Sequence, residues 1–76
     1  MEEVKRINKE FGEIRENVSK RWKKIDKNHQ MLITFQEGKL CGLLSICYSY
    51  KKVPSAMLKL LKEEFEFYKN LTGMEE

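Results

Sequence analysis

The sequence predicts a two-layer α+β domain of order α-β-β-α, with a long N-terminal helix, a β-hairpin and a C-terminal amphipathic helix. Three observations lead to this fold class. Apolar residues between positions 4 and 18 recur at alternating gaps of three and four, as on one face of a helix. Residues 31–50 lose that rhythm and read as period-two segments rich in β-branched and aromatic residues, and residues 57–71 return to helical spacing. All 76 residues are expected to form one domain.

The first helix is expected over about residues 2–25. Acidic residues begin it and basic residues end it, as the helix dipole favours. Its apolar side chains fall within a band about 80° wide, narrower than the apolar face of most helices that pack on a core. So narrow a stripe suits a helix that lies along one neighbour, and Val4, Phe11 and Val18 are predicted to contact another protein chain.

The hairpin is expected over about residues 31–50, with strands at 31–35 and 40–50 and a turn at Glu37-Gly38. The second strand continues past the first, so residues 45–50 lack a partner unless residues 27–30 are already extended. An unpaired strand edge invites another strand, and an isolated hairpin is barely stable. The fold is therefore predicted to be completed by homodimerisation.

The third helix is expected over about residues 55–72, with apolar residues around about 180° of its circumference. One face of a hairpin cannot cover so broad a surface. Glu64 projects from the middle of this arc, so it should pair with a cation such as Arg15 or Arg21, lie at a rim, or bind a partner. The predicted interface residues on this helix are Met57, Leu60, Glu64 and Phe67.

No set of residues indicates catalysis, a metal site or a cofactor. His29 is the only histidine, and no paired spacing of ligands suits zinc. Cys41 and Cys47 would stand about 20 Å apart in a straight strand, beyond disulfide range, so both are expected to be free thiols. The chain is predicted not to be an enzyme.

Hydropathy and the N-terminus bear on localisation. No apolar run approaches the roughly 20 residues that span a bilayer, and the acidic Met-Glu-Glu start differs from a basic signal peptide. Free thiols fit a reducing compartment. A cytoplasmic protein without membrane contact is expected.

A basic cluster supports an alternative partner, because cations on successive helical turns can follow nucleic-acid phosphates. The net charge is +3 and the isoelectric point about 8.9, but Trp22 lies on the apolar stripe, where burial is more common than base stacking. The candidate nucleic-acid contacts are Lys20, Arg21, Lys23, Lys24 and Lys27.

The function predicted from these features is binding to another protein. A chain of this length buries only about 60% of the surface that its unfolded form exposes, and its apolar area exceeds what one small core can cover. We therefore expect a homo-oligomeric, non-enzymatic module that acts as a regulator or inhibitor. The alternatives are a nucleic-acid-binding regulator that uses the basic cluster at residues 20–28, and a small-ligand protein whose cleft lies between subunits.

Overall fold

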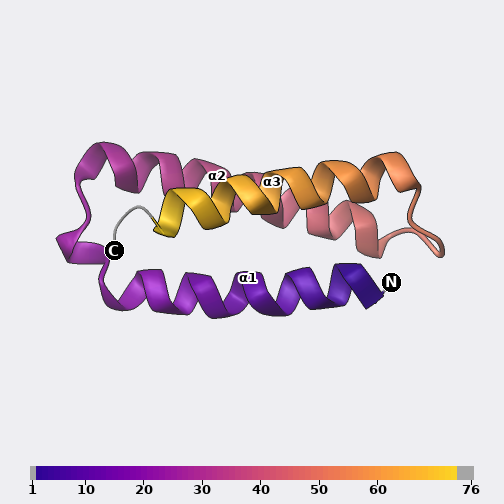
Figure 1. Cartoon of the computed structure of the whole chain (residues 1–76), viewed down its shortest axis with the longest axis horizontal. Helices are drawn as coiled ribbons and strands as arrows, with labels where there is room; N and C mark the ends of the chain where they lie inside the picture. Colours follow the sequence, from indigo (N-terminus) through magenta and orange to yellow (C-terminus); the bar gives the residue numbers. More distant parts are fainter. Residues whose placement is uncertain (1, 74–76) are drawn as a thin grey trace.

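The computed structural model describes residues 2–73 and contains three α-helices. Helix α1 spans Glu2–Lys20, α2 spans Lys27–Tyr48 and α3 spans Ser55–Gly73 (Figure 1). A short 3-10 turn, η1 at Trp22–Lys24, joins α1 to α2. No strand occurs between residues 2 and 73, so the predicted α+β class, its α-β-β-α layering and its hairpin are wrong.

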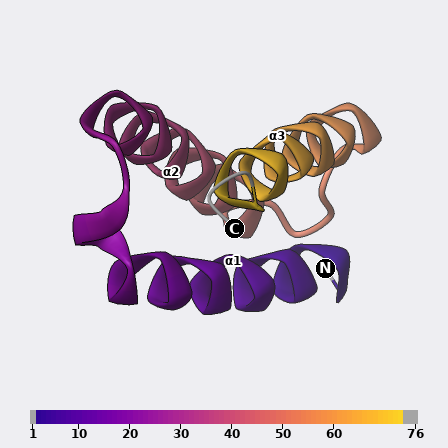
Figure 2. The same ribbon diagram turned by 60° about the vertical axis from the view of Figure 1, so that its left-hand side comes forward.

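The helices form an elongated up-down-up bundle of 40 × 18 × 17 Å. Helices α2 and α3 run antiparallel and pack most extensively on each other, and α1 lies beneath the pair (Figures 1 and 2). Both views show the N-terminal end of α2 raised away from α1, with η1 spanning the space between them. Helix α2 therefore packs on the other helices through one side, and its opposite, outward side faces solvent.

The middle segment is a helix, and its sequence resembles a hairpin because apolar side chains lie on both the core-facing and the outward sides of α2. Its core-facing side chains do follow helical gaps of three and four, but apolar residues on the opposite side hide that pattern. The expected turn at Glu37-Gly38 lies in the middle of the helix. The buried residues of α2 are Ile33, Gln36, Leu40, Leu44 and Cys47.

The boundary between α1 and α2 is set by a cap. Helix α1 ends at Lys20 and not near residue 25, because the chain tightens into η1 and Ile25 adopts an extended backbone. Asp26 then caps α2, its Oδ2 accepting a hydrogen bond of 3.1 Å from the backbone nitrogen of Asn28. Ile25 itself is buried, which fixes the connection against the bundle.

A polar network joins the three helices, from buried Tyr68 to half-exposed Arg15. The Tyr68 hydroxyl on α3 donates to Glu37 Oε2 on α2 at 2.8 Å, and Glu37 Oε1 lies 3.9 Å from Arg15 Nε on α1. The Tyr68 ring meets the Phe11 ring edge-on, with centroids 5.1 Å apart, and the Arg15 guanidinium lies 5.4 Å from the centre of the Phe11 ring. Tyr68 is wholly buried and acts as the central contact of the bundle.

A second polar contact fixes α2 against α3. Gln36 is almost fully buried, and its Nε2 donates to Glu64 Oε1 at 2.7 Å and to the Glu64 carbonyl at 3.1 Å. Lys39 Nζ lies 3.4 Å from the same carboxylate. Glu64 therefore finds its partners on α2 and not at Arg15 or Arg21. The Gln36 hydrogen bond and the Lys39 charge hold the pKa of Glu64 below its ordinary value, despite some opposition from burial.

Replacing Gln36 with leucine should raise the pKa of Glu64 toward the ordinary value and lower the free energy of unfolding by about 1–3 kcal/mol. Because the folded-state pKa of Glu64 is depressed, its contribution is present above the unfolded pKa of about 4.3 and is lost as the pH falls through the folded value. The wild type should therefore lose more stability than Q36L between about pH 5 and pH 3. Carbon-detected NMR titration and urea unfolding measure both effects, and an unchanged Glu64 pKa in Q36L would refute the assignment.

Candidate protein-binding surface

The three helices differ in what they present to solvent. The outward side of α1 is charged along its length, with Lys9, Glu13 and Glu16 exposed, and α3 likewise exposes Lys59 and Glu63. In contrast, residues 28–50 contain only two charged side chains. One of them, Glu37, is turned to α1. The other, Lys39, is half exposed at the edge that borders α3 and pairs there with Glu64, so the centre line of the outward side of α2 carries no charged side chain.

Large apolar side chains occupy that uncharged side. Met31 and Phe35 are each 71% exposed, although two such side chains one turn apart would normally be buried. Leu32 and Ile46 on the same helix are also exposed. On α3, Leu60 and Phe67 are exposed at the edge that borders α2. We call the set Met31, Leu32, Phe35, Ile46, Leu60 and Phe67 the apolar surface.

The helix pairing makes this surface continuous. His29 Nε2 donates to the Leu71 carbonyl at 2.7 Å, and Gln36 bonds to Glu64, which together fix the antiparallel register of α2 and α3. In that register Phe67 lies level with Ile33, and Leu60 lies level with Leu40. The apolar surface therefore extends from α2 onto the neighbouring edge of α3.

Two glycines flatten the centre of the surface. Gly38 and Gly42 lie one turn apart on the outward side of α2, and a Cβ atom added to either would meet nothing within 4 Å. Neither has a positive φ angle, so the backbone does not require glycine. Their place in a helix costs about 1 kcal/mol each relative to alanine, and no contact inside the chain offsets it.

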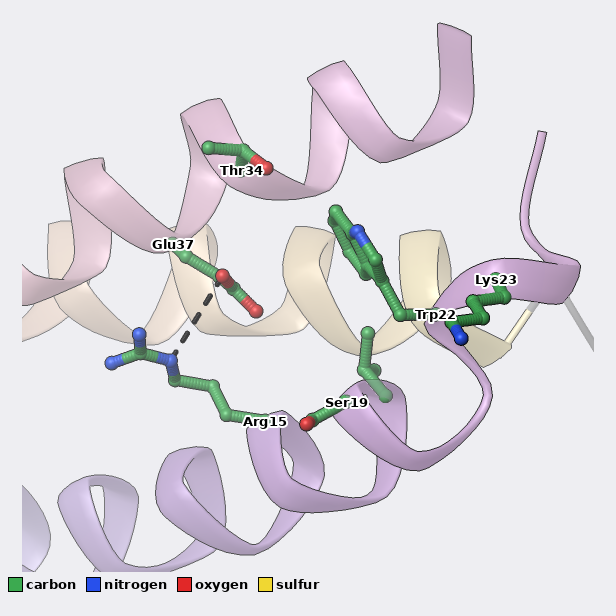
Figure 3. A pocket seen from close by; sticks show the side chains of 7 residues that line it. Arg15, Ser19, Trp22, Lys23, Thr34 and Glu37 are labelled. Atoms are coloured by element: carbon green, nitrogen blue, oxygen red, sulfur yellow. Dashed lines mark ion pairs between the residues drawn. The ribbon is translucent and has the colours of Figure 1, made fainter. Parts of the chain in front are cut away.

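A groove lies beside the apolar surface, where α2 diverges from α1. Figure 3 shows the Trp22 indole lying between the end of α1 and α2, below Thr34 and across from the Arg15–Glu37 ion pair. This part of the groove has a volume of about 420 Å³. A second part, of about 490 Å³, shares Trp22 and Thr34 and reaches Met31 and Phe35. Partly exposed Trp22 thus links the groove to the apolar surface.

The structure distributes the predicted interface residues unevenly. Val4, Phe11 and Val18 are buried in the core, where they contact α2 and α3 and present no surface to another molecule. Leu60 and Phe67 are exposed on the apolar surface, and Met57 is half-buried against the core. Glu64 is half-buried between Gln36 and Lys39.

Sequence reasoning missed the α2 part of the surface. The predicted hairpin places Met31, Leu32, Phe35 and Ile46 on its strands, and none of them is among the predicted interface residues. The available signal was that apolar residues of this segment fall on opposite sides of a helical projection. A helix of this kind is normally covered on both sides, and the bundle covers only one of them.

The basic cluster is split by the fold. Lys20, Lys23, Lys24 and Lys27 are exposed around η1. Arg21 is half-buried and donates from Nη2 to the Thr72 carbonyl at 3.1 Å, near the end of α3. Trp22 lies in the groove between helices. The lysines are thus available to a polyanion, whereas Arg21 and Trp22 are engaged within the bundle.

The histidine and the two cysteines of α2 form no cluster. His29 and Cys41 are separated by 12 positions of α2, about 18 Å along the axis. Cys41 Sγ accepts a hydrogen bond from Arg15 at 3.6 Å, and burial raises the pKa of the Cys47 thiol. The two cysteines lie on a helix, about 9 Å apart along its axis and not 20 Å, and both are free. In the described part of the chain, no group of three or more histidine, cysteine or carboxylate side chains is placed to hold a metal.

Comparison of the chain with known protein families, with curated proteins and with solved structures gave no match. Within residues 2–73, none of the helices combines the length and the apolar character needed to cross a bilayer.

Proposed function

We propose that this chain is a small, non-enzymatic protein-binding module of the cytoplasm, which acts as a regulator or inhibitor and contacts other protein molecules through the apolar surface. The observation that carries the proposal is the outward side of α2, which is apolar and lacks charge at its centre while the outward sides of α1 and α3 are charged. Exposed apolar patches of this kind mark sites of contact with other proteins.

The physical reason is the cost of leaving such side chains in water. Burying a large apolar side chain contributes about 1.5–3 kcal/mol, so Met31 and Phe35 give up that free energy in the isolated chain and recover it on binding. Aromatic and methionine side chains are also enriched at protein interfaces, and Phe35 and Phe67 supply two aromatic anchors.

Nucleic-acid binding is the weaker candidate. The exposed lysines around η1 support it, but Arg21 and Trp22, which would add bidentate and stacking contacts, are engaged within the bundle.

A capture experiment with one matched pair of variants tests the proposed function. Phe67→Lys places a charge on the apolar surface, and Asn70→Lys adds the same charge to an exposed position on the polar side of α3. Tagged wild type and N70K should retain a protein from a lysate of the source organism after nuclease treatment, and F67K should lose it. Equal retention by F67K, loss on nuclease treatment alone, or capture of no protein would contradict the proposal.

A further inference from the structure

We propose that the apolar surface is occupied by a second copy of this chain, docked so that the two α2 helices run antiparallel and cross near Gly38 and Gly42. This inference rests on the proposed function and names the partner of the same surface. It follows from the size, the shape and the charge of the surface.

The available area is sufficient for a dimer. A standard interface buries about 800 Å² on each partner, about a seventh of the 5478 Å² accessible surface of the chain. The bundle measures 40 × 18 × 17 Å, so one long side presents about 700 Å² in flat projection, and projecting side chains add to that. A second copy presents the same apolar surface, so the two surfaces match in length.

The shape of α2 is complementary to itself in one orientation. The N-terminal half of its outward side carries the bulky Met31 and Phe35, and Gly38 and Gly42 follow toward the C-terminal half. With a two-fold axis between residues 38 and 39, Phe35 faces Gly42 of the partner subunit and Met31 faces Ile46 of the partner subunit. A parallel pair would instead set each Phe35 against its own equivalent and leave the glycines facing each other across a gap.

The charges near the ends of α2 favour the same orientation, and at its centre Lys39, which lies beside the two-fold axis, is neutralised by its ion pair with Glu64 at 3.4 Å. In the antiparallel register the exposed Asp26, which caps α2, lies toward the end of the partner subunit's α2, which is followed by Lys51 of the partner subunit. A parallel pair would place Lys27 next to its own equivalent, and likewise Lys51 and Lys52. Exposed charges add little affinity, but like charges in contact select against an orientation.

The glycines acquire a role in this arrangement. No atom of the chain approaches the position of a Cβ at Gly38 or Gly42, so their small size is unused in the monomer. Across the two-fold axis they let the helices approach closely and receive Phe35 of the partner subunit, as small residues do at close helix crossings. The dimer thus accounts for two residues whose helix propensity is otherwise unfavourable.

Disulfide crosslinking tests the orientation in the full chain. In a Cys41→Ser background, which leaves buried Cys47 as the one native thiol, Gly38→Cys should give a crosslinked dimer under mild oxidation. Asn28→Cys, also exposed on α2, should stay uncrosslinked because two copies of position 28 would lie about 30 Å apart. Crosslinking at both positions would indicate a parallel pair, and crosslinking at neither would indicate no α2 pair; either result overturns the proposal.

Gly42→Leu separates dimer loss from unfolding. The new side chain meets open space in the monomer, so G42L should unfold at the same or higher urea concentration when compared as a monomer. It fills the space that receives Phe35, so we expect dimerisation to weaken at least tenfold. Dimerisation as tight as in the wild type would overturn the proposal. A wild-type monomer that still captures a protein through Phe67 would also overturn it, while leaving the proposed function intact.

Discussion

Tyr68→Ala is expected to lower the free energy of unfolding by about 3–5 kcal/mol, the usual cost of removing a large buried aromatic side chain. Tyr68 is wholly buried, packs edge-on against Phe11 and donates to Glu37, so its loss removes a contact that all three helices share. A domain of this size has roughly 4–11 kcal/mol of stability in total, so the variant should be close to unfolding. Urea denaturation followed by circular dichroism measures the change.

Tyr68→Phe separates packing from the hydroxyl and gives a pH signature. Burial, followed by the hydrogen bond to Glu37, raises the pKa of Tyr68 above its ordinary value of about 10. For a raised folded-state pKa, the stability is fully present below the unfolded pKa and falls as the pH rises above it, by about 1.4 kcal/mol per pH unit for one proton. Above pH 10 the wild type should lose stability more steeply than Y68F. Parallel curves for the two proteins would contradict the position assigned to Tyr68.

Phe35→Lys is expected to abolish self-association without unfolding the chain. Phe35 is 71% exposed in the single chain, so its replacement should change monomer stability by no more than about 0.5 kcal/mol. At the centre of an interface, truncating an aromatic anchor costs about 2 kcal/mol or more of binding free energy, which raises the dissociation constant about 30-fold. The buried lysine charge would add to that cost. Light scattering at several concentrations gives the mass.

Asn8→Lys is the matched control for Phe35→Lys, because it adds the same charge to an exposed position on α1. It should associate as the wild type does. If F35K keeps the wild-type mass, the outward side of α2 is not the interface. If F35K unfolds, Phe35 contributes to the core more than its exposure indicates.

The sequence predicts the outer helices better than the middle one. The stripe that includes Val4 and Phe11 has its apolar residues on one side and charged residues on the other, so its period is visible and α1 follows from it. Helix α3 is visible for the same reason. In α2, Ile33 and Leu40 are core residues while Met31 and Phe35 are exposed, so both sides are apolar and the helical period disappears.

The same property explains what could be predicted of the candidate site. An excess of apolar area is evident from composition and from the broad apolar face of α3, and Leu60 and Phe67 on that face are exposed in the structure. Their role as contact residues stays a prediction. The stripe of α1 could not be recognised as core from the sequence, because its narrow width also suits a helix that contacts another chain. The packing of α1 against both α2 and α3 shows that the stripe faces the core. The α2 residues of the apolar surface could be recognised only once residues 27–48 were known to form a helix.

We expect a second copy of the chain to cover the outward side of α2. Sedimentation equilibrium of the wild type from roughly 1 to 100 µM tests it most directly, since interfaces of standard size dissociate at micromolar concentrations or below. We expect a mass of twice the 9.1 kDa chain at the upper end of this range, falling toward that of the single chain only on dilution. A folded particle of 9.1 kDa at every concentration would contradict the account.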